Sequence, residues 1–366
     1  MILQILLSLL VAAASSATLI TRPPGPYDTF YNTAQLTDTS RLDPFSPIPT
    51  NRTILTSTFI PTYCSTPLQE TPYLPPATAT YYANFFASYG LNLSSISNLF
   101  HTLKLQTCPR PSHPSLNYPL LIFSPALGTT RLFYNILAQA IASQGYIVLS
   151  IDHPYDTEFL EFSNGDIIFG LNLTDAQIPL DVHTRARDVS FVIDQLSTPS
   201  GLSTLLGLPN RTVEWLRTDR VGVYGHSLGG AAAADAMGFD SRIVAGINFD
   251  GTMYGPVIET GLHNQSFLIF GHENKTQDTD STWKEFWGNT RGGWQLELEL
   301  EGAQHYTFSD LPDLLEDLGV DVDGLPEVEG IIGRLEGRRA IDIIRGVVGG
   351  FFGISLGDPA VRIIAL

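Results

Sequence analysis

The stretch Val221-Gly-Val-Tyr-Gly-His-Ser-Leu-Gly-Gly230 decides the fold of this 366-residue chain. A short β-branched run delivers Ser227 between Gly225 and Gly229, and an alanine-rich segment typical of a helix follows directly. A turn this sharp between a strand and a helix crowds the backbone on both sides of its central residue, so glycine is needed where a Cβ would collide. The pattern therefore predicts a nucleophile elbow with Ser227 at its corner. An incidental serine in a glycine-rich turn is the plainer alternative.

The chain after Pro109 alternates between strand-like and helix-like segments. Strands are predicted at 119–123, 146–151, 221–224, 243–249, 267–270 and 295–300, and helices at 130–144, 182–196 and 340–352. Strands separated by helices favour a mostly parallel, doubly wound sheet with helices on both faces. The chemistry of such a sheet lies at the carboxyl ends of its strands.

The segment before this alternation has a different composition. Residues 22–76 hold nearly half of the 24 prolines, which excludes long helices and predicts an extended segment that wraps the body. Within it, 52–60 reads as a strand near a sheet edge. Apolar residues recur at helical spacing between Tyr81 and Leu105, which predicts one or two amphipathic helices. We expect these helices to pack against the body of the protein; the more specific alternative is that they contact lipid.

The overall composition limits the size of the core and the kinds of partner that the chain can have. With 43% hydrophobic and 16% charged residues, the chain can bury one large core or two modest ones. A net charge of −17 disfavours nucleic acid and anionic membranes as partners, so a neutral or zwitterionic substrate is easier to accommodate. The sequence has no Cys/His ligand cluster and no phosphate-binding glycine loop after an early strand. We therefore expect neither a metal nor a cofactor.

The N-terminus reads as a secretion signal. Residues 1–14 are almost wholly apolar, and Ser15-Ser16-Ala17 supplies the small residues that signal peptidase needs, which predicts a signal peptide over 1–17. The stretch is too short for a comfortable membrane span, so we expect a secreted, extracellular protein without a transmembrane segment.

Secretion fits two further features of the sequence. Glycosylation sequons occur at Asn51, Asn92, Asn172, Asn210, Asn264 and Asn274. The two cysteines, Cys64 and Cys108, are predicted to form a disulfide, with two free buried thiols as the alternative.

A serine nucleophile needs a histidine to accept its proton and a carboxylate to orient that histidine. Three histidines follow Ser227. His263 lies in a loop beside a sequon, His272 directly follows a strand, and His305 lies just beyond the last strand, where a loop can fold back towards the elbow. This position favours His305 as the base over a merely structural histidine.

The acid has two candidates, because Asp250 and Glu273 end consecutive predicted strands and either could reach the histidine. The oxyanion hole needs two N–H donors. The backbone of Leu228 supplies one, and the loop Ser124-Pro-Ala-Leu-Gly128 is placed to supply the other from Leu127 or its neighbour.

Taken together, these residues make the chain resemble the secreted platelet-activating-factor acetylhydrolases, serine esterases of the α/β-hydrolase fold that release short acyl groups from the second position of phospholipids. Phe123-Ser-Pro-Ala-Leu-Gly128 looks like the oxyanion loop of that family, in which a histidine and a glycine commonly occupy positions 125 and 126. Gly225-His-Ser-Leu-Gly-Gly230 looks like its nucleophile motif, and Gly302-Ala-Gln-His305 like its histidine loop. The family's spacing favours Asp250 over Glu273 as the acid.

The resemblance implies an α/β-hydrolase fold with a mostly parallel doubly wound sheet, antiparallel N-terminal strands and helices on both faces. It implies one domain over 18–366, with an N-terminal part at 18–110 and a catalytic core at 111–366. The expected activity is hydrolysis of short acyl esters through an acyl-enzyme, as in a 1-alkyl-2-acetylglycerophosphocholine esterase. A peripheral lipid contact through 91–103 is also expected from this comparison.

Two rival functions stay open at this point. A general secreted carboxylesterase, or a polyester or cutin hydrolase, shares the same elbow. A hydrolase-fold binding protein without catalysis is the remote alternative, because such proteins usually lose a triad member and none is obviously lost here.

Overall fold

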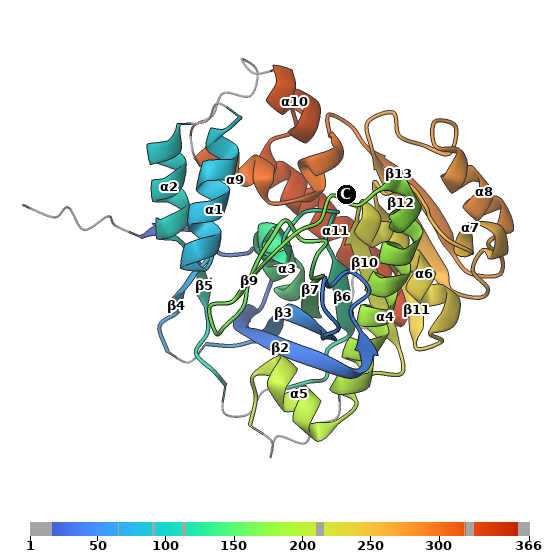
Figure 1. Ribbon diagram of the computed structural model, residues 1–366, viewed down its shortest axis with the longest axis horizontal. Coiled ribbons are helices and arrows are strands. Elements are labelled where there is room, and N and C mark those ends of the chain that lie inside the picture. The colour runs from blue at the N-terminus through green and yellow to red at the C-terminus, as the bar shows by residue number, and fades with distance from the viewer. Residues whose placement is uncertain are drawn as a thin grey trace, which may run out of the picture.

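An eight-stranded sheet forms the centre of the computed structural model, which describes residues 17–64, 66–89, 92–111, 115–209, 216–317, 319 and 326–357 (Figure 1). The strand order is β13-β12-β11-β10-β6-β7-β3-β2. The strands are β2 (Asp28–Leu42), β3 (Asn51–Thr62), β6 (Leu120–Ser124), β7 (Ile147–Asp152), β10 (Val221–His226), β11 (Ile243–Phe249), β12 (Ser266–His272) and β13 (Gln295–Leu300). Neighbours from β7 to β13 are parallel, whereas β2 and β3 are antiparallel. The predicted fold class is confirmed.

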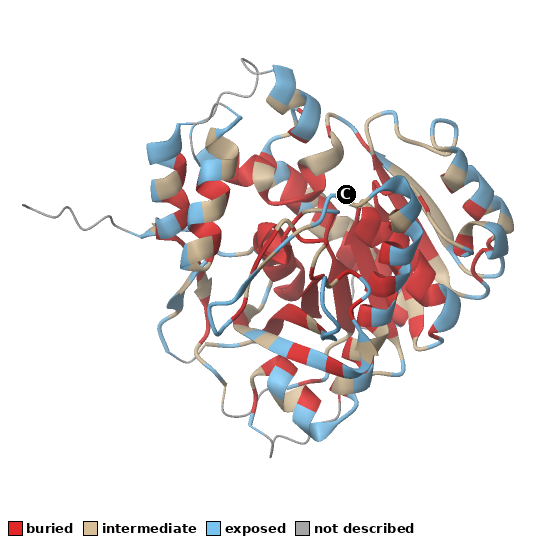
Figure 2. Ribbon diagram, in the orientation of Figure 1, coloured by how far each residue is buried: buried red, intermediate tan, exposed pale blue. Residues whose placement is uncertain are grey.

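Helices cover both faces of this sheet. Helices α3 (Asn135–Ala142) and α11 (Gly337–Leu356) pack on one face, and α4 (Ile178–Leu196), α6 (Leu228–Phe239) and α8 (Ser281–Asn289) pack on the other. Figure 2 shows that the strands between these layers are largely buried. Consecutive strand residues such as Ile122 and Phe123 enter opposite core clusters. This is why the strands read as continuous apolar runs in the sequence.

A smaller N-terminal unit packs beside the central sheet. Strands β1 (Thr18–Leu19), β5 (Leu103–Thr107) and β4 (Gln69–Pro72) form a three-stranded sheet, next to helices α1 (Pro76–Ala87) and α2 (Leu93–Thr102). A disulfide joins Cys64 to Cys108, whose Cα atoms are 5.5 Å apart. The predicted disulfide is confirmed, and the alternative of two free thiols is wrong.

The apolar face of α2 packs inward rather than towards lipid. Leu99 and Phe100 are only 5% and 2% exposed, and the Phe100 ring lies 6.1 Å from that of Phe133. The expectation that lipid contact runs through the whole segment 91–103 is therefore wrong for its apolar stripe, because the stripe completes the hydrophobic core. Residue 91 lies outside the described residues.

The remaining elements are short and lack strong sequence signals. They are the hairpin β8 (Phe159–Glu161) and β9 (Ile167–Phe169), helices α5 (Pro199–Leu206), α7 (Val257–Thr260), α9 (Leu311–Asp317) and α10 (Pro326–Ile332), and the 3₁₀ turns η1 (Arg131–Tyr134), η2 (Asp175–Gln177) and η3 (His305–Phe308). The single helix predicted at 130–144 is instead split, because Phe133 leaves helical geometry and α3 begins at Asn135.

Five of the six sequon asparagines lie in the described residues, and all five are exposed: Asn51, Asn92, Asn172, Asn264 and Asn274. Asn210 and residues 1–16 of the expected signal peptide lie outside the described residues. Among the described residues, no helix is long and apolar enough to span a bilayer.

Candidate active site

Ser227 occupies a strained turn between β10 and α6. Its φ of 55° is in the left-handed region, which residues with a side chain rarely adopt. A Cβ on Gly225 would collide with the Gly229 backbone, and a Cβ on Gly229 would collide with the Ser124 carbonyl. Both glycines are therefore needed sterically. Gly229 has a second role that the sequence does not reveal, since it lets the loop after β6 lie directly against the elbow.

That loop presents the amide expected to complete an oxyanion hole. The Ala126 N–H donates to Tyr134 Oη at 3.3 Å, and the Gly128 N–H donates to Asp156 Oδ1 at 3.2 Å. Within the described part of the chain, neither the Leu127 N–H nor the Leu228 N–H has a hydrogen-bond acceptor. Leu127 is also 37% exposed, so a substrate can approach this loop. Both amides predicted as oxyanion donors thus remain available for an external oxygen.

The expected base and one of its two candidate acids lie together. His305 begins η3, and its Nδ1 hydrogen-bonds to Asp250 Oδ2. Asp250 directly follows β11, is fully buried and has a φ of 60°. Glu273 is directed elsewhere, because its Oε2 accepts from the Gly302 N–H at 3.1 Å. The structure therefore brings Asp250 to His305 and uses Glu273 to brace the loop that precedes the histidine.

The environment of Asp250 keeps its carboxylate ionised. Burial would raise the pKa of Asp250, but hydrogen bonds from His272 and His305 and the charge of Lys275 outweigh it and hold that pKa well below its usual range. The carboxylate is thus negative at neutral pH. It can orient the His305 ring and stabilise the imidazolium that forms during proton transfer.

His272 is a second histidine beside Asp250, and the sequence alone did not assign it a role. Its Nδ1 lies 2.6 Å from Asp250 Oδ1, and its backbone N–H donates to the same oxygen at 3.0 Å. Asp250, His272 and His305 each offer one ligand atom within 4.8 Å of the others, as a metal site would require. Hydrogen bonds between the two imidazoles and the carboxylate already account for this grouping. The only signal for His272 in the sequence is its position at the end of the strand next to β11.

Tyr134 joins the oxyanion loop to the elbow. Its hydroxyl accepts from the Ala126 N–H and lies 2.8 Å from His226 Nδ1. Burial, helped by nearby His305, lowers the pKa of His226 well below its usual value, so this ring is neutral and can accept from Tyr134. The His226 and His305 ring centroids are 4.7 Å apart, which places the base beside the residue that precedes Ser227. No sequence pattern pointed to Tyr134.

Comparison with known proteins agrees with this geometry. The family described as platelet-activating factor acetylhydrolase, isoform II, matches residues 50–159 and 211–343. The chain belongs to this family. A "Probable 1-alkyl-2-acetylglycerophosphocholine esterase" of Arthroderma benhamiae is 32% identical over 95% of this chain and 90% of its own length. The platelet-activating factor acetylhydrolase of Gallus gallus is 24% identical over 67% of this chain and 66% of its own.

A solved structure extends the likeness to the whole fold. The ferulic acid esterase of Streptomyces cinnamoneus superposes with a TM-score of 0.77 at 25% identity, over 96% of this chain and 97% of its own. This acetylhydrolase-family chain is accordingly an ester hydrolase of the α/β-hydrolase fold.

Proposed function

We propose that the chain is a serine esterase that cleaves short acyl esters through an acyl-enzyme, with the acetyl ester of a 1-alkyl-2-acetylglycerophosphocholine as its substrate. The observation that carries this proposal is the hydrogen bond that His305 Nδ1 donates to Asp250, beside the strained elbow at Ser227. The substrate class is supported by the printed name of the Arthroderma benhamiae relative.

Each residue then has one task in the reaction. Ser227 attacks the ester carbonyl while His305 Nε2 takes its proton, and Asp250 holds the ring in the tautomer that allows this. The Leu127 and Leu228 amides bind the oxyanion. His305 next protonates the leaving alcohol, and a water molecule repeats the cycle on the acyl-enzyme.

The test is Ser227→Ala, measured on para-nitrophenyl acetate and on acetyl and long-chain phosphatidylcholines. We expect the variant to melt like the wild type and to show no turnover, because the attacking oxygen is gone. If the variant retains activity, Ser227 is not the nucleophile of this reaction. Wild-type preference for simple aryl esters over the acetyl phospholipid would instead favour a general carboxylesterase or a polyester hydrolase.

We further infer that the protein is secreted as one domain covering 18–366. The apolar N-terminus, the disulfide and the five exposed sequons support secretion. The sheet supports a single domain, because the N-terminal part supplies β2 and β3 to the same sheet that carries Ser227.

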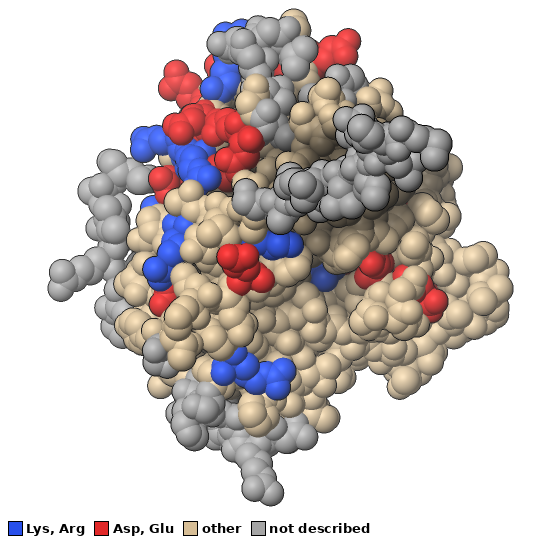
Figure 3. Space-filling model, turned by 90° about the vertical axis from the view of Figure 1, so that its left-hand side faces the viewer, with Lys and Arg blue, Asp and Glu red and all other residues tan. Residues whose placement is uncertain are grey.

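A peripheral lipid contact is proposed for the tip of the α1–α2 pair. Residues 71–103 contain no Lys, Arg, Asp or Glu although the whole chain carries −17. Figure 3 shows that charged side chains are sparse over much of the face that these helices occupy. Among the described residues of this tip, Tyr89 and Leu93 are large apolar side chains that are exposed. An uncharged surface with exposed apolar groups suits a zwitterionic lipid surface.

Leu93→Ser tests this contact, because it removes apolar area and leaves the Asn92 sequon intact. Binding to phosphatidylcholine vesicles should weaken, while hydrolysis of a soluble aryl acetate should not change. Ile354→Ser on α11 is the matched control, since Ile354 is 50% exposed and Leu93 is 47% exposed. Equal vesicle binding by both variants would contradict the proposed contact.

A further inference from the structure

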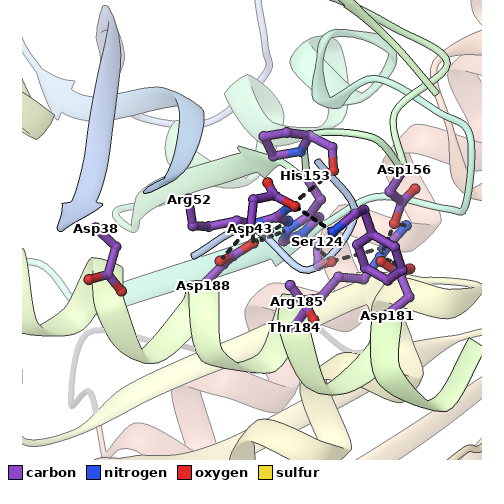
Figure 4. A network of polar contacts seen from close by, with 12 residues as sticks. Asp38, Asp43, Arg52, Ser124, His153, Asp156, Asp181, Thr184, Arg185 and Asp188 are labelled. Carbon is purple, nitrogen blue, oxygen red and sulfur yellow. Dashed lines mark hydrogen bonds and ion pairs between the residues drawn. The ribbon is translucent and has the colours of Figure 1, made fainter. Parts of the chain in front are cut away.

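A buried arginine lies directly behind the oxyanion loop (Figure 4). Arg185 of α4 is fully buried, and its Nη1 donates to the Pro125 carbonyl at 2.6 Å and to Ser124 Oγ at 3.3 Å. Its other nitrogens form an ion pair with Asp156 and a 3.2 Å contact with Asp181. One guanidinium thus holds the start of the loop and contacts two carboxyl groups with its other nitrogens.

Asp156 holds the other end of the same loop. Its Oδ1 accepts from the Gly128 N–H at 3.2 Å, while its Oδ2 pairs with Arg185. Arg185 thus binds the Pro125 carbonyl, Asp156 binds the Gly128 amide, and the ion pair between them links the two ends of the loop. Only Ala126 and Leu127 lie between these two anchors. The Ala126 N–H is itself bound to Tyr134 Oη, so the orientation of the Leu127 peptide is fixed from both sides.

We propose that Arg185 is a positioning residue that, through its bond to Pro125 and its ion pair with Asp156, aims the Leu127 N–H at the reacting oxygen. This inference rests on the proposed esterase function. An oxyanion donor acts only within about 2.7–3.1 Å of the developing charge, so a small shift of the loop weakens it. The planar guanidinium fork suits this task, because its donors keep fixed directions that a lysine ammonium cannot reproduce.

The same network contains a second array of serine, histidine and aspartate. Ser124 Oγ lies 2.9 Å from His153 Nε2, and His153 Nδ1 lies 2.9 Å from Asp188 Oδ2. Ser124 is only 2% exposed and accepts a hydrogen bond from Arg185, so it is neither accessible nor free to attack a substrate. Burial lowers the pKa of His153, which keeps this ring neutral, so that its Nε2 can accept a hydrogen bond from the Ser124 hydroxyl. The array therefore anchors the end of β6 and is no second nucleophile.

Arg52 provides a control with closely matched surroundings. It is buried like Arg185, pairs with Asp43 and Asp188 at 2.8 Å each, and donates to the Pro154 carbonyl at 3.0 Å. Each arginine thus serves two carboxylates and one proline carbonyl. In the described chain, the hydrogen-bond partners of Arg52 all lie outside residues 124–128, and Arg52 is linked to Ser124 only indirectly, through Asp188 and His153.

The experiment compares Arg185→Lys with Arg52→Lys in the full-length protein. The readouts are the melting temperature, kcat and KM for para-nitrophenyl acetate, and Ki for a trifluoromethyl ketone, whose hemiketal oxygen occupies the oxyanion hole. We expect both variants to melt lower than the wild type. Arg185→Lys should lower kcat about ten- to a hundredfold and raise Ki by a similar factor, with KM changed less than about twofold. Arg52→Lys should leave kcat and Ki within about twofold.

Equal losses of kcat in the two variants, or an unchanged kcat and Ki in folded Arg185→Lys, would overturn the proposal. If Arg185→Lys does not fold, Asp156→Asn replaces it, since this change removes the ion pair but keeps an oxygen for Gly128. An unchanged Ki in that variant would overturn the proposal equally. A wild type without esterase activity would instead refute the proposed function, so the two failures are distinguishable.

Discussion

Replacing Asp250 by asparagine should nearly abolish turnover. The carboxylate accepts from His305 Nδ1, so it fixes the tautomer in which Nε2 can take the serine proton. An amide at this position can present an N–H to the ring and favour the wrong tautomer. The fold should survive, because an asparagine oxygen can still accept from the His272 backbone N–H, which donates to Asp250 at 3.0 Å.

The size of the loss follows from the charge that is removed. A carboxylate and the imidazolium formed in the transition state, about 4 Å apart at an effective dielectric constant of about 20, attract by roughly 4 kcal/mol. Every 1.36 kcal/mol is about tenfold in rate, so the charge alone accounts for about 10³. The wrong tautomer adds to this, and the same substitution in the triad of a serine protease lowers kcat by about 10⁴. We therefore expect kcat to fall by about 10³ to 10⁴ at neutral pH.

Glu273→Gln is the matched control for this substitution. Glu273 Oε2 accepts from the Gly302 N–H at 3.1 Å, and a glutamine oxygen can accept the same bond. We expect its kcat to stay within about threefold of the wild type, since no charge next to His305 is lost. Steady-state hydrolysis of para-nitrophenyl acetate, with a melting curve for each variant, measures both effects. A larger loss in Glu273→Gln than in Asp250→Asn would refute the assignment of the acid.

Two further predictions concern stability. Burial raises the pKa of Asp310 to about 7, so this group stabilises the fold most below about pH 4 and loses that contribution as pH rises through about 7. Between about pH 4 and pH 7, the free energy of unfolding of the wild type should therefore fall by about 4 kcal/mol more than that of Asp310→Asn. Denaturant titrations at several pH values measure this difference. If the unfolding free energies of the two proteins change with pH in parallel, the raised pKa is contradicted. Replacing Cys64 and Cys108 together by alanine opens a loop with a sequence separation of 44 and should lower the unfolding free energy by about 4 kcal/mol; an unchanged denaturation midpoint would refute this.

Much of the architecture was predictable because each strand of the parallel sheet is a short apolar run. The strands at 243–249 and 295–300 have the predicted bounds, and the elbow follows from the glycines around Ser227. The order of serine, acid and histidine along the chain then limited the candidates. These inferences succeed because they depend on local steric demands and on strand order.

The rest depends on contacts between distant segments. Asp250 and Glu273 end neighbouring strands, and only the turn at Asp250 and the fold of the histidine loop direct one of them to His305. Arg185 acts through a backbone carbonyl 60 residues away in sequence, and Tyr134 links the nearby loop to His226, which is 92 residues away. No local pattern marks such residues. The periodicity of α2 showed that it has an apolar face, but not that the core covers it.

The disulfide also decides how the protein would respond to a protease. Cys64 and Cys108 enclose the whole α1–α2 pair, while Ser227, Asp250 and His305 all lie beyond the second cysteine. A cut inside this loop would leave two chains that remain covalently joined. Such a nicked enzyme would run as one species on a non-reducing gel and as two after reduction, with its catalytic residues still on a single uncut fragment. Limited proteolysis could thus alter the uncharged helical face without dismantling the hydrolase.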